Sequence, residues 1–501
     1  MKSIKKACLY LHRYCGWLVG VVFLILCVTG CLLAIQPEIE YWVEPSRFTV
    51  PEHSGETMKT AGQLVKTFEK LESESFAEPT TVHVQRLQTS SNPRNTWYAL
   101  VSARNDKQTW AYIAYVDPYT GKGVSYGPSK ANGFFRAVRG WHSSLKIQSL
   151  GFLNKPIARI AGAGDASGGG RVGVMLVGLF GVLTAFVLLT GLVRWFPKLR
   201  NNKNLGNSFR PSFNHGKFRA LFDLHSVVGF YATALLLALC LSGSWRAVPW
   251  LRSCCDKLVG YDASQNAAAS TPRGQGNGSR GQGNGSRGQG DGSRGQGDGM
   301  RRGGGGPDKE EDTTNYGSGI LARRSPGAGG FSPHALAALT ANNAFKCEKI
   351  LETPASLDEI FESQQALTPS SKGFDVILPD AGSDRAITIT RYGSFAGFCK
   401  PDVYYWDQYT GKNLGKTSFS DLTFGEQFHS LIIPFHTGKI FGALSRWILF
   451  LVGLAGVVLT ITGYTMTATR LLQKRRRAAE AGKFDDADRK AEESAEKTAE
   501  E

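Results

Sequence analysis

Four long apolar stretches constrain the fold of this chain more than any other feature. They cover residues 17–35, 172–196, 227–245 and 443–466. As a helix, the first would reach about 28 Å at about 1.5 Å per residue, close to the hydrocarbon thickness of a bilayer. None carries Asp, Glu, Lys or His at its centre, and a tryptophan lies near an end of each: Trp17, Trp195, Trp245 and Trp447. Because interfacial tryptophans are typical of membrane helices, the sequence predicts an integral membrane protein with four such helices.

Basic residues beside these stretches predict how the chain is oriented. Lys and Arg cluster, with few acids, before the first stretch, between the second and third, and directly after the fourth. Flanks of this kind stay in the cytoplasm. We therefore expect 1–16, 197–226 and 467–501 to be cytoplasmic, and the long connections 36–171 and 246–442 to lie outside. The excess of 58 Lys+Arg over 42 Asp+Glu is concentrated in the flanks, which argues against a nucleic-acid partner.

The first stretch could instead be a cleaved signal, because Lys2 to Lys6 resembles a basic leader and Val28 to Cys31 a lipoprotein cleavage box. However, its apolar part is longer than that of a usual signal peptide, and no small-residue cleavage site follows. We expect the span to be retained.

Self-comparison indicates a tandem duplication. His12 is followed by Gly16 after four residues and by Gly30 after eighteen, and His225 is followed by Gly229 and Gly243 at the same offsets. Outside the membrane, YVDPYTGK at 115–122 matches YWDQYTGK at 405–412. The chain therefore reads twice as span, outer domain and span, which makes the halves parallel repeats.

The outer regions predict small α+β domains. Segments 80–126 and 372–415 alternate apolar and polar residues, as half-buried strands do, and helical patterns precede them at 60–71 and 356–364. We expect one small antiparallel sheet in each region.

These motifs together carry a resemblance to a known family. The opening LHRYCGWLVG, the YVDPYTG turn and the TGLVRW that ends the second span resemble PepSY-associated transmembrane proteins. The resemblance implies an iron-regulated protein of the bacterial inner membrane, with two PepSY-like domains in the periplasm. It also implies a di-haem reductase of ferric siderophores.

One segment departs from the family pattern. Residues 271–306 repeat Arg, Gly, Gln, Asn and Ser, a composition with nothing to bury, so we expect a disordered loop inside the second outer domain. Segments of this kind can bind RNA, but a tolerated insertion is the better interpretation outside the membrane.

Two histidines near the cytoplasmic side are candidate haem ligands. His12 and His225 occupy equivalent repeat positions, so a pseudo-twofold axis along the membrane normal would bring them face to face. Small residues nearby could make room for a b-type haem, and Arg13 or a loop arginine could pair with a propionate. The small residues are Gly16, Gly20 and Gly229.

The ligands on the outer side are less clearly defined. Repeat alignment matches His142 with His429, whereas the family pattern, HTG before a span, falls on His436. We predict that His142 and His436 ligate a second haem b, and that His429 is a substitute ligand or a substrate-side residue. We interpret the remaining histidines as surface residues: His53, His83, His215 and His334.

A simpler interpretation of these features competes with ligation. A histidine at a helix end can be a cap or a polar group reaching for the interface, and membrane glycines can serve close helix packing alone.

The expected function is outward electron transfer. Two haems would pass electrons from a quinol or a cytoplasmic reductase to a ferric siderophore in the periplasm, which would release ferrous iron. The alternative is a non-enzymatic PepSY membrane protein that binds peptides or regulates a protease. A transporter is less favoured, because the spans contain no central charges. No nicotinamide, flavin or ATP motif is visible.

The cysteines fit an oxidising exterior. Cys347 and Cys399 are a candidate disulfide of the second outer domain, and Cys254 with Cys255 could be vicinal or pair elsewhere. Because the chain contains no CxxCH, attachment of a c-type haem is not expected.

Overall fold

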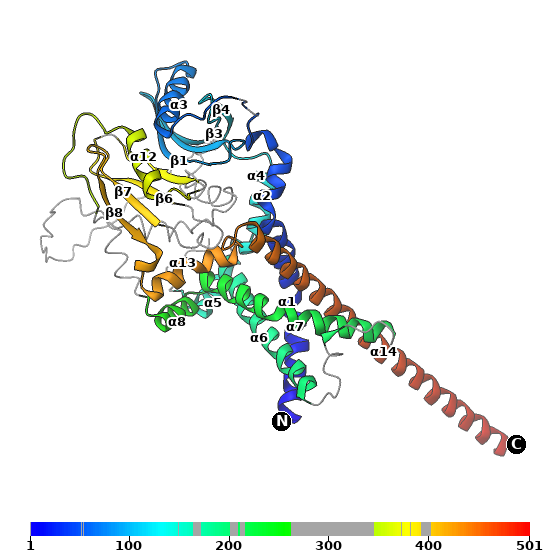
Figure 1. Cartoon of the computed structure of the whole chain (residues 1–501). Helices are drawn as coiled ribbons and strands as arrows, with labels where there is room; N and C mark the ends of the chain where they lie inside the picture. Colours follow the sequence, from blue (N-terminus) through cyan, green and yellow to red (C-terminus); the bar gives the residue numbers. More distant parts are fainter. Residues whose placement is uncertain are drawn as a thin grey trace, which may run out of the picture.

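A bundle of four long helices carries a sheet domain at one end, as the computed structural model shows (Figure 1). The structure describes residues 2–51, 53, 55–148, 150–163, 172–200, 209–210, 216–261, 345–371, 373–380, 382–391 and 402–500. The expected insert 271–306, His215 and His334 lie outside the described residues.

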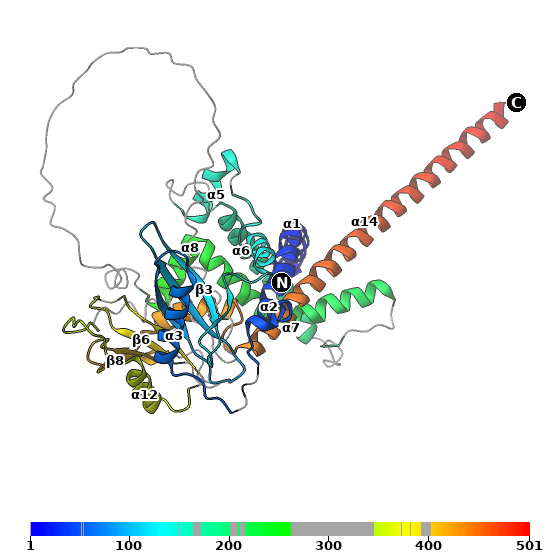
Figure 2. The same ribbon diagram turned by 90° about the horizontal axis from the view of Figure 1, so that it is seen from above.

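The four bundle helices contain the four apolar stretches. Each is long and apolar enough to cross a membrane. They are α1 (Lys2–Ala34), α6 (Val172–Arg200), α7 (Lys217–Ala247) and α14 (Ala443–Glu500). Each packs mainly against two neighbours, in the cyclic order α1, α6, α7, α14, so α1 faces α7 across the bundle. The helices run past the apolar stretches, α14 farthest of all (Figures 1 and 2), so His12 and His225 lie within continuous helices.

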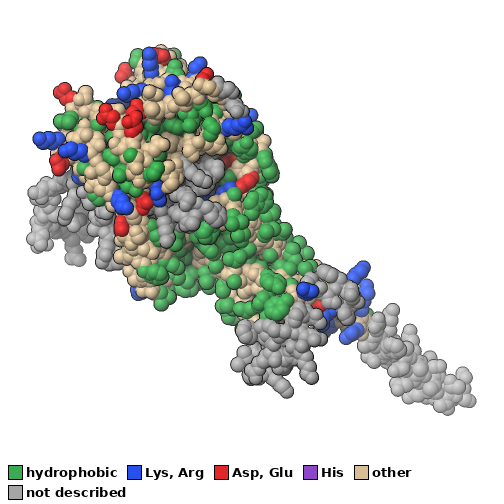
Figure 3. Space-filling view, viewed as in Figure 1, with side chains coloured by type: hydrophobic (Ala, Val, Ile, Leu, Met, Phe, Trp, Pro, Cys, Tyr) green, Lys and Arg blue, Asp and Glu red, His purple; other side chains and the backbone are tan. Residues whose placement is uncertain are grey.

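Side-chain chemistry divides the surface in the same way. Apolar side chains cover the flank of the bundle, whereas charged side chains gather on the sheet domain and beyond the far end of the bundle (Figure 3). A surface of this kind suits an apolar solvent around the bundle and water at its ends.

Eight strands form one antiparallel sheet in the order β4-β3-β2-β1-β5-β6-β7-β8. The first outer region supplies β1 (Thr81–Gln88), β2 (Trp97–Arg104), β3 (Thr109–Val116) and β4 (Gly123–Tyr126). The second supplies β5 (Phe374–Ile377), β6 (Ile387–Arg391), β7 (Asp402–Trp406) and β8 (Asn413–Ser418). The sequence led us to expect a separate sheet in each region, and the structure instead joins them through β1 and β5.

The junction between the two regions combines an apolar residue pair with an ion pair. Leu87 of β1 pairs with Val376 of β5, and the Arg86 guanidinium makes a two-pronged ion pair with the carboxylate of Asp375. The Asp375 side chain is only 3% exposed. Because a buried carboxylate needs a partner, this pair ties the two halves together.

Two helices cover one face of the sheet. They are α3 (Ala61–Ser75) and α12 (Leu357–Leu367), and both begin within a residue of the predicted positions. Thr60 caps α3 in a capping box, and Phe68 and Ile360 are fully buried against the strands. The helices meet where the Gly62 amide donates to the Asp358 carboxylate at 2.7 Å.

The two YxDxYTGK motifs adopt the same turn. The carboxylates of Asp117 and Asp407 each accept a hydrogen bond from the amide two residues later, at 2.8 Å. Gly121 and Gly411 take positive φ angles of 75° and 67°. The motif is thus a structural turn in both regions, while the duplication itself stays a prediction.

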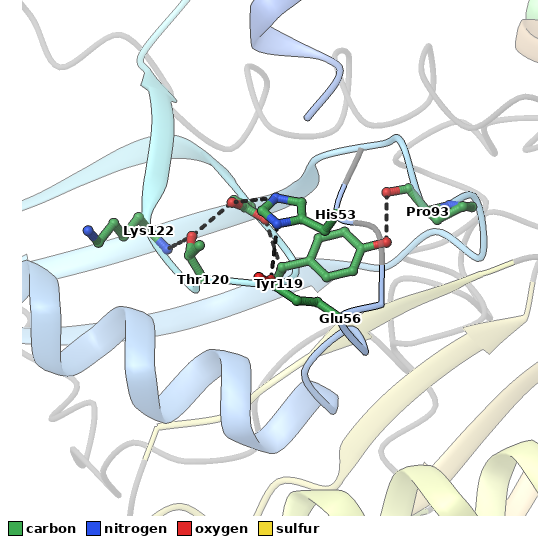
Figure 4. Close-up of polar contacts among 7 residues, drawn as sticks. His53, Glu56, Pro93, Tyr119, Thr120 and Lys122 are labelled. Carbon is green, nitrogen blue, oxygen red and sulfur yellow. Dashed lines mark hydrogen bonds and ion pairs between the residues drawn. The ribbon is translucent and has the colours of Figure 1, made fainter. Parts of the chain in front are cut away.

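His53 belongs to the first of these turns and not to the open surface that we expected. Its ring stacks on Tyr119 with centroids 4.3 Å apart, and its Nδ1 lies 3.0 Å from a Glu56 oxygen (Figure 4). These contacts close the loop that precedes α3.

Short helices connect the sheet to the bundle. They are α2 (Gln36–Val43), α4 (Asn132–Ser144), α5 (Asn154–Ala161), α8 (Pro249–Val259) and α13 (Phe424–His436), with single 3₁₀ turns at Pro45–Arg47, Gly151–Leu153 and Phe419–Asp421. Arg446 at the start of α14 donates to Glu38 of α2 at 2.6 Å, which fastens one bundle end to the connection.

Candidate functional site

The structure brings four of the candidate histidines together as two pairs. His12 of α1 and His225 of α7 face each other with ring centroids 6.2 Å apart. We call them the distal pair, because they lie near the bundle end away from the sheet. His142 of α4 and His436 of α13 form the sheet-side pair, also with centroids 6.2 Å apart.

The two pairs lie at opposite ends of the bundle. Thr29 on α1 contacts His142, and Ser242 on α7 contacts His436. Each of these residues is seventeen positions beyond the distal histidine of its helix, counting from 12 to 29 and from 225 to 242. At about 1.5 Å per residue, the pairs are about 25 Å apart along the bundle.

The ring spacing suits two ligands of one metal ion. A metal ion lies about 2 Å from an imidazole nitrogen, and that nitrogen lies about 1 Å from the centre of its ring, so two ligands of one ion have ring centres roughly 6 Å apart. Both pairs have this separation. In the described part of the chain, no group of three or more His, Cys, Asp or Glu side chains gathers around a common point.

Each of the four rings is held by a neighbouring bundle helix through a Ser or Thr followed by Gly. His12 Nδ1 lies 3.0 Å from the Val187 carbonyl oxygen and 3.3 Å from Thr190 Oγ1. For the other rings the hydroxyl lies at 2.9 to 3.0 Å from Nδ1. These hydroxyls belong to Thr462 for His225, Thr29 for His142 and Ser242 for His436.

The glycine of each dipeptide lies against the same ring. A Cβ on Gly191 would meet His12 Cε1 at 2.9 Å, and one on Gly243 would meet His436 Cε1 at 3.0 Å. At Gly30 and Gly463 the corresponding distances to His142 and His225 are 3.3 and 3.5 Å. The four dipeptides are therefore cradles, one on each bundle helix.

Sequence reasoning noticed Thr29-Gly30 and Ser242-Gly243 only as repeat markers. It missed the ring contacts of Thr190-Gly191 and Thr462-Gly463. A usable signal was present, because each apolar stretch contains one Ser/Thr-Gly dipeptide.

A cavity of about 250 Å³ surrounds the distal pair. Its wall is mostly apolar and includes both rings, and among the described residues its Lys and Arg side chains are those of Arg13 and Arg470. The three glycines expected to make room there also line it. Gly16 and Gly229 have ordinary contacts, whereas the Tyr464 ring already fills the space beside Gly20. At Gly20 the absence of a side chain therefore makes room for Tyr464.

Trp195 adds a polar group to this cavity wall. Its side chain is 5% exposed and stacks on Phe230 with centroids 3.8 Å apart. Among the residues that the structure describes, no acceptor lies within hydrogen-bond reach of its indole N–H. Because buried N–H groups normally have an acceptor, this donor is suited to a bound group in the cavity.

The sheet-side pair is half-buried between its helices. Burial lowers the pKa of His142, an effect partly opposed by its hydrogen bond to the Leu26 carbonyl. Burial, and then the nearby His142 and Arg246, lower the pKa of His436. Both side chains are therefore neutral at neutral pH, and neutral imidazole is the form that binds metal.

Local structure explains the position of His436. It is the last residue of α13, whose first turn is closed by a capping box between Thr423 and Glu426. Gly438 follows with φ at +67° and lies against the backbone of Arg446, a place where a Cβ would be only 3.0 Å from the Arg446 Cα. The HTG sequence therefore ends α13 tightly against α14.

His429 lies apart from the ring contact that joins His142 to His436. It packs between Tyr261, at 4.2 Å between centroids, and Trp245, at 4.6 Å. In the sheet domain, His83 lies beside Glu69, whose carboxylate raises the pKa of the imidazole. Each of these two histidines is packed against neighbouring protein groups.

The structure describes one cysteine of the expected Cys347–Cys399 disulfide. Cys399 lies outside the described residues. Cys347 is a buried free thiol that donates to the Arg385 carbonyl at 3.4 Å, and Cys254 and Cys255 are also free thiols.

Comparison with protein families identifies a match. The model of the PepSY-associated TM region matches residues 9–470, which include all four apolar stretches and both histidine pairs. No curated protein matches the chain.

Proposed function

Because the chain belongs to the PepSY-associated TM region family, we propose that this multi-pass membrane protein is a haem-containing reductase that passes electrons across the bilayer to a ferric siderophore. The observation that carries the proposal is the pair of facing histidines at each end of the bundle, with ring centroids 6.2 Å apart in both.

The residues present fit a haem at each pair. The distal pair has a largely apolar cavity beside its rings, with Arg13 and Arg470 suited to the propionates and the Trp195 N–H as a further donor. The sheet-side pair has neutral imidazoles held by Thr29 and Ser242. If each pair held a haem b, His12 with His225 and His142 with His436 would bind its iron, and the haem would supply one-electron transfer.

The direction of transfer follows from the basic flanks. These predict that the distal end lies at the cytoplasmic face and the sheet domain in the periplasm of a bacterial inner membrane. A quinol or a cytoplasmic reductase would then supply one electron at a time near His12 and His225. Each electron would leave near His142 and His436 and reduce one ferric ion of the substrate to ferrous iron. Oxygen chelators bind ferrous iron more weakly, so the metal would be released.

In this scheme the protein's own residues hold the two cofactors and set the distance between them. The separation of about 25 Å between the pairs would span most of the hydrocarbon layer. The ferric chelate is substrate and needs only access to the sheet-side end.

Absorbance spectra of the purified protein test the proposal. We expect the bands of low-spin haem b, loss of one haem in His12→Ala or His225→Ala, and reduction of a ferric siderophore by the reduced protein. A colourless, well-folded protein that binds peptides would support the alternative, a non-enzymatic PepSY membrane protein.

A further inference from the structure

The strongest unexplained pattern in the molecule is the recurrence of one contact four times. Each histidine of the two pairs presents Nδ1 to a hydroxyl, and each hydroxyl comes from a bundle helix that does not itself bear that histidine. In the first half, α6 holds the ring of α1 through Thr190, and α1 holds the ring of α4 through Thr29. In the second half, α14 and α7 do the same for His225 and His436.

Each of the four hydroxyls already donates its proton to a backbone carbonyl of its own helix. Thr190 donates to the Val187 carbonyl at 2.7 Å, and Thr29 to the Ile25 carbonyl at 2.6 Å. Thr462 donates to the Val458 carbonyl at 2.7 Å, and Ser242 to the Leu239 carbonyl at 3.1 Å. A hydroxyl has a single proton, so toward the histidine each oxygen can only accept.

This fixes where the imidazole proton lies. If the hydroxyl oxygen accepts, Nδ1 must carry the proton and donate it. His12 gives an independent check, because its Nδ1 also lies 3.0 Å from the Val187 carbonyl, which has no proton to give. In a neutral imidazole with its proton on Nδ1, the lone pair is on Nε2.

We propose that the four Ser/Thr hydroxyls are positioning groups that hold each ligand histidine in the Nδ1–H tautomer, so that Nε2 is the atom that ligates haem iron. This inference rests on the proposed function. Hydrogen bonding from a ligand's second nitrogen also makes the imidazole a stronger donor, which stabilises ferric iron and lowers the reduction potential.

The best test uses Thr462, because its 2.9 Å contact to His225 is among the shortest of the four. Thr462→Val keeps the side-chain shape and removes the hydroxyl. We expect the distal haem to bind about 10–100-fold more weakly, as for other partners of metal-bound histidine, and its reduction potential to rise. Thr462→Ser should restore both values.

Two controls separate this effect from misfolding. Thr465→Val, one turn further along α14, removes a hydroxyl that donates to the Ile461 carbonyl at 2.8 Å and has no histidine contact in the described structure. It should leave both haems unchanged. The sheet-side haem of Thr462→Val serves as an internal control and should keep its potential.

The outcomes are distinct. If the unaltered protein binds no haem, the proposed function fails and the inference fails with it. If the unaltered protein binds two haems but Thr462→Val has the same affinity and potential, only the inference is overturned. Loss of both haems in Thr462→Val without rescue by Thr462→Ser would also overturn it, since a positioning group acts on its own ligand.

Discussion

Alanine at the four cradle glycines should damage haem binding in proportion to how closely each glycine approaches its ring. The sharpest comparison is Gly191→Ala against Gly463→Ala. Both substitutions act on the distal pair, and both replace a helical glycine, so the change in helix propensity is similar. They differ in that a Cβ would lie 2.9 Å from His12 Cε1 at position 191 and 3.5 Å from His225 Cε1 at position 463.

The magnitude follows from these distances. Carbon atoms pack best at about 3.5–4.0 Å, so Gly191→Ala requires the His12 ring or the helix to move by about 0.6 Å, and Gly463→Ala requires almost no movement. Metal–ligand distances tolerate only about 0.2 Å. Overpacking of this kind costs about 1–3 kcal/mol. At about 1.4 kcal/mol per factor of ten, haem affinity should fall about 5–150-fold in Gly191→Ala.

Titration of haem-depleted protein with haem b, followed by absorbance, measures the affinity. We expect weakened distal binding in Gly191→Ala and nearly unchanged binding in Gly463→Ala. At the sheet-side pair, Gly243→Ala, with a 3.0 Å contact, should be more damaging than Gly30→Ala, with a 3.3 Å contact. Equal losses in the two distal variants, or none in Gly191→Ala, would show that the glycines serve helix packing alone.

Two further predictions concern the second pair and the sheet. His436→Ala should remove the sheet-side haem and leave the distal haem in place, whereas His429→Ala should retain both haems. The haem content per chain measures both variants. Loss of a haem in His429→Ala would contradict the ligand assignment. Asp375→Ala removes the buried carboxylate that pairs with Arg86 and should destabilise the sheet by about 3–5 kcal/mol, whereas Lys107→Ala, which breaks an exposed ion pair, should cost no more than about 1 kcal/mol. Thermal unfolding followed by circular dichroism checks both, and similar melting temperatures for the two variants would refute the role of the junction.

Local patterns in the sequence predicted much of the architecture. The four apolar stretches lie inside the four long helices, because length and apolarity alone decide which segments can cross a membrane. The strands also fall within the alternating segments 80–126 and 372–415, except that β8 extends to Ser418. Both kinds of signal come from neighbouring residues.

The joining of the sheet could not be predicted in this way. Strand alternation identifies β1 and β5 as strands, but it does not say that Leu87 pairs with Val376 almost three hundred residues away. An edge strand has the same alternation whichever partner it finds.

The sequence predicted only part of the candidate site, because it does not record contacts between distant segments. Repeat positions placed His12 opposite His225, and the structure has their rings facing each other. On the outer side, repeat alignment favoured His429 beside His142, whereas the ring contact is with His436. The anchoring hydroxyls, such as Thr190, were missed because their role depends on contacts between helices that no spacing within one helix records.

The measurement that most directly tests the account is the number of haem b groups per chain, with their axial ligation, in protein purified from cells supplied with ample haem. Pyridine haemochrome analysis and electron paramagnetic resonance should give two low-spin haems, each with two imidazole ligands. A folded protein with no haem, or with haem retained after both His12 and His142 are replaced by alanine, would contradict the central claim that these facing pairs hold the cofactor.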